Sequence, residues 1–351
     1  DIMLDQYTYG NVSRISPEAP VPIVLTQDHK FSLGGAANVA CNLVELGAKV
    51  SLFGVVGDDH HKDILIKNLK HQGIKSDGLV IDKNRQTILK HRIIVRERQL
   101  LRLDYEETVP LDKQTTVKLL KKILHELPKV GAVVFADYDK GCLNEIIVPA
   151  VIKEARKRDL IICADLKPKN KSLYVGVTMI APNFEEGSEM SGFRDTDEIG
   201  KALTKYFKSD VFLTQGSEGL TVFTKKGKVY HHAPVGGVAR DVSGAGDTVL
   251  AVAAIGYLAK LPHDSIGFLA NRAGGLVVQK YGTSTVTVEE LIGFATGDKH
   301  VSGLPLIEKL WGYEKWIEND DKYCSKLLFL KRGYQCSLHY HKIKDETFYI
   351  K

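Results

Sequence analysis

The octapeptide from Asp241 to Thr248 (Asp-Val-Ser-Gly-Ala-Gly-Asp-Thr) places a glycine-rich turn and a carboxylate in front of the apolar run 249–258. Such a turn can open a helix whose first backbone N–H groups point outward, and these donors and the helix dipole favour a phosphate or a developing negative charge. Asp247 would lie beside that anion, where it could take a proton from an attacking hydroxyl. The stretch therefore indicates phosphoryl transfer to an alcohol, although an ordinary loop with a helix N-cap fits the same residues.

A second glycine-rich stretch, Gly34-Gly35-Ala36-Ala37-Asn38, opens another predicted helix. Paired glycines let a ligand approach the backbone closely, and the side-chain amide of Asn38 can donate to and accept from sugar hydroxyls. Close packing of the helix explains the glycine pair equally well. Asp5 follows what we predict to be the end of a strand, where its carboxylate could hold two vicinal hydroxyls or cap a turn.

Short apolar segments alternate with helical ones over much of the chain, and this order must position the two motifs. We predict strands at 47–57, 130–136, 160–164, 178–181 and 210–213, and helices at 36–46, 59–72, 112–127, 144–158, 184–191 and 196–207. Strands that alternate with helices indicate parallel βαβ units and a doubly wound, mostly parallel sheet of the α/β class. Ligands of such sheets bind at the carboxyl ends of the strands.

Polar residues directly follow four of these strands. The four polar endings begin at Asp137, Asp165, Asn183 and Thr214. Because parallel strands end at the same edge of a sheet, we expect these endings to form one site. Carboxylates and amides beside phosphates suit Mg²⁺ that keeps part of its water shell.

Two segments depart from the alternation of strands and helices. Residues 12–33 and 86–104 are rich in β-branched and charged residues, and 86–95 and 99–105 flank a predicted hairpin turn. Extended pairs of this kind in an α/β domain form a lid or a dimer surface, and the alternative is an edge hairpin without a function.

Composition and charge narrow the class of protein. The chain has 351 residues, of which 44% are hydrophobic and 26% charged, and its net charge is +5. These values are typical of a globular protein, and no dense basic block with interleaved aromatic residues indicates nucleic-acid binding. No apolar run reaches the length of a membrane span. The five cysteines form no Cys-x-x-Cys pair, so we expect reduced thiols and a cytoplasmic location.

The two glycine-rich motifs resemble the two signatures of the ribokinase (PfkB) family of sugar kinases. Further segments are similar to the bacterial D-glycero-D-manno-heptose-7-phosphate kinases of ADP-heptose synthesis, namely 13–22, 101–107, 137–141 and 282–286. The resemblance covers about residues 1–295 and places the first strand of the family upstream of Asp1. It implies a homodimeric kinase with a β lid that uses ATP and Mg²⁺ to phosphorylate the anomeric hydroxyl of a heptose 7-phosphate. A kinase for another sugar or hexose phosphate is the alternative within the family.

The resemblance also implies a role for each matching residue. It makes Asp247 the general base, and it assigns stabilisation of the transferring phosphoryl group to the amides of Gly244, Ala245 and Gly246. It implies that the sugar phosphate is bound by Asp5, Arg14, Gly34, Gly35, Asn38, Arg92, Lys140 and Lys167. It implies that ATP and Mg²⁺ are bound by Asn183, Glu186, Thr214, Gly216, Gly219, Asp241 and Asn271. For each basic residue, a surface ion pair is the competing interpretation.

Residues 311–351 are rich in aromatic residues and differ in composition from the rest of the chain. Gly333, His339, His341 and Glu346 resemble in their spacing the first motif of the cupin family, of the mannose-6-phosphate isomerase type. Histidines at i and i+2 of a strand face the same way, so they could hold a transition metal such as Zn²⁺ or Fe²⁺, and the alternative is a remnant whose histidine pair binds no metal. We predict a kinase domain at 1–298, a linker at 299–310 and a partial cupin-like β segment at 311–351. The alternative function is a metal-dependent isomerase or binding module on a degenerate kinase scaffold.

Overall fold

The computed structural model divides the chain into two compact units, Asp1–Thr287 and Val288–Lys351. It describes residues 1–96, 98–236, 239–280 and 282–296, and the three strands 306–309, 312–319 and 324–330. The first unit ends before residue 298, where the sequence suggested the end of the kinase domain.

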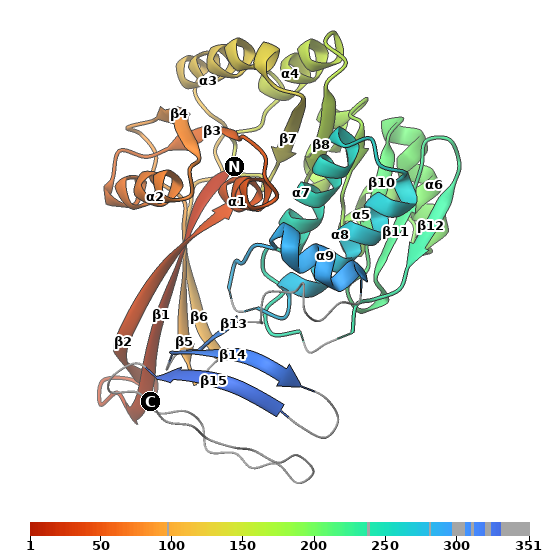
Figure 1. Ribbon diagram of the computed structural model, residues 1–351. Helices are drawn as coiled ribbons and strands as arrows, with labels where there is room; N and C mark the ends of the chain where they lie inside the picture. The colour runs from red at the N-terminus through yellow and green to blue at the C-terminus, as the bar shows by residue number, and fades with distance from the viewer. Residues whose placement is uncertain are drawn as a thin grey trace. The chain divides into compact units, whose positions relative to one another are not determined.

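A six-stranded sheet in the order β12-β11-β10-β9-β8-β7 forms the centre of the first unit (Figure 1). Its strands are β7 (Ala132–Ala136), β8 (Ile161–Asp165), β9 (Met179–Ile180), β10 (Asp210–Thr214), β11 (Leu220–Phe223) and β12 (Val229–His232). Strands β7 to β10 are parallel, whereas β11 and β12 are added antiparallel, so the sheet is mixed. The four parallel strands end at one edge, as we expected from their polar endings.

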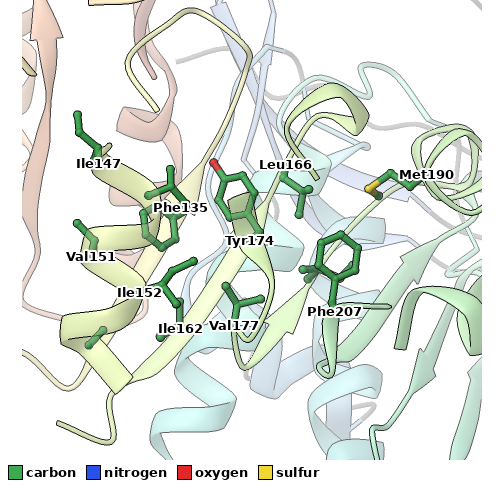
Figure 2. Packing of buried hydrophobic residues seen from close by; sticks show 14 of the residues in the cluster. Phe135, Ile147, Val151, Ile152, Ile162, Leu166, Tyr174, Val177, Met190 and Phe207 are labelled. Atoms are coloured by element: carbon green, nitrogen blue, oxygen red, sulfur yellow. The ribbon is translucent and has the colours of Figure 1, made fainter. Parts of the chain in front are cut away.

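Helices cover both faces of this sheet (Figure 1). One face carries α3 (Lys113–Glu126), α4 (Ile147–Arg156), α5 (Phe184–Ser191) and α6 (Thr196–Phe207), and the other carries α7 (Ala245–Leu258) and α8 (His263–Val277). The apolar residues of α4 recur at helical spacing, so Ile147 and Val151 are buried together with Phe135 of β7 (Figure 2). The ring of Phe135 meets that of Tyr174 edge to face, with the centroids 5.6 Å apart.

Helix α7 is apolar on nearly all sides, which is typical of a helix enclosed by other elements. It contacts β8, α8 and α1 (Ala36–Glu45), and Leu250, Ala251 and Ala253 have no solvent-exposed surface. The glycine-rich turn of the octapeptide is therefore attached to one of the most deeply buried helices of the unit.

A four-stranded sheet in the order β2-β1-β5-β6, which we call the lid, extends from the first unit (Figure 1). Its strands are β1 (Ile2–Ile15), β2 (Pro22–Gly35), β5 (Leu89–Val95) and β6 (Arg98–Tyr105). The antiparallel pairing of β5 with β6 confirms the predicted hairpin. The strand end predicted before Asp5 is wrong. Because β1 pairs with β2 along nearly its whole length, Asp5 lies inside a strand, opposite Ser32.

The remaining elements of the first unit are a second parallel strand pair, one helix and three 3-10 helices. Strands β3 (Ser51–Val56) and β4 (Lys75–Ile81) form a separate parallel pair, and α2 (His60–His71) lies between them in sequence. Three short 3-10 helices complete the unit: η1 (Leu127–Lys129), η2 (Pro168–Tyr174) and η3 (Gly216–Glu218). The observed helices α1 to α6 confirm the predicted helical segments to within a few residues.

The second unit contains α9 (Val288–Thr296) and an antiparallel sheet of β13 (Leu306–Lys309), β14 (Gly312–Asn319) and β15 (Cys324–Leu330). Strand β13 lies within the predicted linker. The predicted metal ligands His339, His341 and Glu346 lie outside the described residues, so the cupin-like metal site stays a prediction. In the described part of the chain, no helix is long and apolar enough to cross a membrane.

Candidate active site

Asp247 lies in the first turn of α7, and both of its carboxylate oxygens accept a hydrogen bond. Asn38 Nδ2 donates to Oδ2 at 2.7 Å, and the Tyr138 hydroxyl donates to Oδ1 at 2.5 Å. Only 4% of Asp247 is exposed. Burial raises the pKa of its carboxyl group from 3.8 to about 6, against the two hydrogen bonds, which lower it. Such a group is mostly ionised at pH 7 and basic enough to take a proton from a hydroxyl.

Gly244 is the N-cap residue of α7, and its conformation requires glycine. Its φ is 82°, in the left-handed region. A Cβ atom there would lie 2.7 Å from Asn38 Nδ2, the group that donates to Asp247. The absence of a side chain at this position therefore lets Asn38 reach the carboxylate. The start of α7, from Ala245, supplies the partial positive charge that favours a phosphate.

Buried hydrogen bonds join the starts of α1 and α7. The Thr248 hydroxyl donates to Asn42 Oδ1 at 3.0 Å, and Asn42 Nδ2 donates to the backbone oxygen of Asn38 at 3.0 Å. The two glycine-rich motifs, about 200 residues apart in sequence, thus form one site.

Asp5, Gly34, Gly35 and Arg92 come together at the junction of the lid and α1. Arg92 forms an ion pair with the buried carboxylate of Asp5, and a Cβ atom on Gly34 would lie 2.5 Å from Asp5 Oδ2. Burial raises the pKa of Asp5, while the Arg92 guanidinium opposes that rise. Gly35 precedes α1 with a φ of 56°. The predicted sugar-binding residues Asp5, Gly34, Gly35, Asn38 and Arg92 therefore surround the start of α1.

Of the other predicted phosphate ligands, Lys140 and Lys167 lie at the edge of the central sheet, whereas Arg14 lies far from it. Lys140 pairs with Glu106 at 2.6 Å, and Lys167 forms an ion pair with Glu186. Both lysines follow strands of the central sheet, β7 and β8. Arg14 is exposed near the far end of β1, nine residues beyond Asp5, which in an extended strand is roughly 30 Å. Within one chain, Arg14 is not brought to the site.

Carboxylates accumulate beside the start of α7. Asp165, the last residue of β8, has an oxygen 3.9 Å from where a Cβ atom of Gly246 would lie. Burial raises the pKa of Asp165 well above its usual value, and the charges of Glu186 and Asp247 add to the rise. A divalent cation would offset this negative charge, and carboxylate oxygens are the donors that Mg²⁺ prefers. In the part of the chain that the structure describes, no three His, Cys, Asp or Glu side chains form a metal cluster, and Mg²⁺ commonly needs only one or two beside phosphates.

The predicted nucleotide-binding residues follow β9 and β10 or lie on α8. Asn183 caps α5 in a capping box with Glu186 and pairs through a parallel bridge with Thr214. Both Gly219 and Asn271 contact the segment 232–234: a Cβ atom on Gly219 would collide with the backbone there, and Asn271 Nδ2 donates to the oxygen of residue 233 at 2.6 Å. Gly216 begins η3 with a φ of 57°.

Asp241 links the octapeptide by hydrogen bonds to the chain that follows α8. Its carboxylate accepts hydrogen bonds from the backbone N–H groups of Ser243 at 2.9 Å and Gly282 at 3.1 Å. The structure therefore gives Asp241 a role in holding the glycine-rich turn, beside the nucleotide contact that the resemblance implied.

The sequence profile of the pfkB family carbohydrate kinases matches residues 2–290. The chain belongs to this family. The bifunctional protein HldE of Coxiella burnetii (strain Dugway 5J108-111) is 40% identical over 296 residues, which cover 83% of this chain and 61% of that protein. HldE of Geobacter metallireducens is 33% identical over 335 residues, which cover 94% of this chain and 68% of that protein. The chain therefore spans about three fifths to two thirds of the length of these relatives.

Solved structures of lower identity share the fold of this pfkB-family kinase. Phosphofructokinase-2 from Escherichia coli in complex with potassium has a TM-score of 0.69 at 16% identity, with 86% of this chain and 96% of that chain covered. Arabidopsis thaliana ribokinase complexed with ribose and ATP has a TM-score of 0.62 at 20% identity, with 80% and 91% covered. These likenesses show a ribokinase-like α/β fold, and the family match confirms the predicted carbohydrate kinase, which in this family uses ATP and Mg²⁺.

The sequence alone indicated no role for Tyr138, although its hydroxyl donates to Asp247. The residue belongs to the polar ending after β7, so its place at the active edge of the sheet was predictable. Its contact with Asp247 spans 109 residues of sequence, and no local pattern shows such a pairing.

Proposed function

We propose that this protein transfers the γ-phosphoryl group of ATP to the anomeric hydroxyl of D-glycero-D-manno-heptose 7-phosphate, giving the 1,7-bisphosphate. The observation that carries the kinase chemistry is the buried Asp247, with a pKa of about 6, beside the start of α7. Similarity to the bifunctional HldE proteins, together with the resemblance of segments 13–22, 101–107, 137–141 and 282–286 to the heptose-7-phosphate kinases, supports the acceptor. Because the donor is ATP, we also propose a cytoplasmic location.

Asp247 takes the proton of the anomeric hydroxyl as that oxygen forms its bond to the γ-phosphorus. The bond from the γ-phosphorus to the oxygen bridging the β- and γ-phosphates breaks, and ADP leaves. The backbone N–H groups of Gly244 to Gly246 and the start of α7 stabilise charge on the transferring group. Asp165 and Glu186 would hold Mg²⁺, which when bound neutralises phosphate charge.

The distal phosphate of the acceptor needs its own cations, and we propose Lys140 and Lys167 for this role. Each follows a strand that ends beside the base, and the ammonium group of Lys167 lies 5.6 Å from the ring centre of Tyr138. Each lysine pairs with a single carboxylate, Glu106 or Glu186, and can exchange that partner for a phosphate. We assign Arg92 to holding Asp5, because the two form a buried ion pair.

An ADP-release assay over phosphorylated and unphosphorylated heptoses and hexoses tests this proposal. We expect turnover that requires a sugar phosphate and Mg²⁺, and a loss in kcat of about 10²- to 10⁴-fold for Asp247→Asn. Asp63→Asn, on the exposed side of α2, is the matched control and should keep full turnover. Strict preference for an unphosphorylated sugar would overturn the acceptor, and unchanged turnover of Asp247→Asn would overturn the role of the base.

We further propose a homodimer formed through the lid. Alternate residues of the edge strand β6 expose Leu101, Leu103 and Tyr105, which are 52%, 38% and 45% exposed. An apolar row on an edge strand favours association, and a second copy would cover it. Sedimentation should show that Leu101→Lys with Leu103→Lys is a monomer, whereas Val117→Lys, on α3, stays a dimer. A monomeric unaltered chain would contradict the proposal.

The cupin-like segment is a separate proposal. We propose that His339, His341 and Glu346 bind a transition metal, and the antiparallel sheet of β13 to β15 supports an all-β segment. Metal analysis of the purified chain tests this. Absence of a transition metal with kinase turnover intact would reject the site, and with it the alternative of a metal-dependent isomerase.

A further inference from the structure

The hydroxyl of Tyr138 is one of two donors to Asp247, and the roles assigned above make no use of it. The residue directly follows β7, and its backbone N–H donates to the Asp1 carboxylate at 2.8 Å, which holds the turn in place. Its hydroxyl reaches Asp247 Oδ1 at 2.5 Å, while Asn38 Nδ2 reaches Oδ2 from α1. The two donors therefore approach different oxygens from different elements.

We infer that Tyr138 is a positioning residue for the general base, whose hydroxyl holds the Asp247 carboxylate ionised and in one orientation while the acceptor hydroxyl binds. This inference rests on the proposed role of Asp247. A carboxylate offers about four lone pairs, and Asn38 and Tyr138 occupy one on each oxygen. Lone pairs thus stay available to the acceptor while both donors remain bound. One donor on each oxygen also prevents the carboxylate from rotating.

Charges on several elements act on the same carboxylate. Asp5 of β1 raises the pKa of Asp247, whereas Lys167 lowers it. Asp165 of β8 also interacts with Asp247. The pKa of Tyr138 itself lies well above its usual value, because of burial first and the Asp247 charge second. Tyr138 therefore stays a protonated donor and does not compete with Asp247 as the base.

Tyr138→Phe tests the inference, because it keeps the ring and removes only the hydroxyl. Loss of a donor to an ionised carboxylate raises the pKa of that carboxylate. In the pH profile of kcat/KM for the acceptor, we expect the fall in activity on the acidic side (the acid limb) to move to higher pH by about one unit or more. The KM for ATP should be unchanged. The control is Tyr174→Phe, because that hydroxyl donates to Asp137 at 2.8 Å at the same edge of the sheet. Its acid limb should coincide with that of the unaltered chain.

An acid limb of Tyr138→Phe that coincides with that of the unaltered chain would overturn the inference. If this variant fails to fold, 3-fluorotyrosine at position 138 replaces it, since the more acidic phenol is a stronger donor. The acid limb should then move to lower pH, and an unchanged or higher limb would overturn the inference. Asp247→Asn separates the two proposals. Retained turnover there would overturn the base itself, whereas lost turnover without any shift at Tyr138 would overturn only the positioning role.

Discussion

Gly244→Ala perturbs the contact between the two glycine-rich motifs at a single atom. At φ 82° and ψ 3°, alanine costs about 1–2 kcal/mol because its Cβ atom crowds the following carbonyl oxygen. The new Cβ would also lie 2.7 Å from Asn38 Nδ2. Because Asn38 is buried, its side chain cannot avoid this contact by turning into solvent. Asn38 must shift, and its hydrogen bond to the Asp247 carboxylate, worth about 1.5–3 kcal/mol, is weakened or lost. We expect the free energy of unfolding to fall by about 2–5 kcal/mol.

Gly192→Ala is a control with the same backbone geometry. Gly192 ends α5 at φ 79° and ψ 7°, and a Cβ atom there would meet nothing within 4 Å. Its substitution should cost the left-handed conformation alone, about 1–2 kcal/mol, with full kinase activity. Denaturant unfolding and ADP release, measured on both variants, isolate the contact with Asn38.

The decisive comparison is between the two alanine variants. Gly244→Ala should lose more stability than Gly192→Ala, and it should also lose most of its kcat, since Asp247, the proposed base, has lost a donor. Equal losses in unfolding free energy, together with equal activity, would show that the hydrogen bond from Asn38 to Asp247 does not depend on the absence of a side chain at position 244.

Two further predictions concern buried charge. Arg92→Gln leaves the Asp5 carboxylate buried without its cation, so we expect the free energy of unfolding, measured with denaturant, to fall by about 3–5 kcal/mol. Adding Asp5→Asn to the same chain should restore most of this loss. No recovery in the double variant would contradict the pairing. Asp247→Asn should stabilise the fold at pH 8 by up to about 3 kcal/mol, because burial raises the pKa of Asp247 from 3.8 to about 6 and thus disfavours its ionised form. The gain should shrink as the pH falls below about 6 and vanish only well below pH 3.8, where the carboxyl group is protonated in both the folded and the unfolded chain. A gain in thermal unfolding that does not depend on pH would refute this cause.

The features predicted correctly from the sequence are those with local causes. Glycines at 34, 35 and 244 mark helix starts because the backbone there is close to other groups or left-handed, and short apolar runs mark parallel strands. The strand end predicted before Asp5 was wrong because β1 continues through Asp5 from the core into the lid, where its backbone keeps pairing with β2. The contacts of Tyr138 could not be predicted, because they depend on which distant segments the fold brings to one edge of the sheet.

The ion pairs of Lys140 and Lys167 also depend on contacts between segments that are distant in sequence, so they could not be predicted either. Each lysine was expected near the active edge, and each is there, but its partner comes from a different part of the chain, Glu106 or Glu186. Only the folded chain shows which carboxylate each lysine would have to leave in order to bind a phosphate.

Strand β1 spans two environments without a break. Leu4 is fully buried in the core, whereas Ile15 at the other end is 60% exposed. The irregularities in its pairing with β2 follow Tyr9 and Val12, both beyond Asp5. A change of twist at these points would move the far end of the lid and leave Asp5 attached to the core. For protein engineering, this makes the far end of the lid a place for a fluorescent reporter or a short insertion that leaves the carboxylate in position.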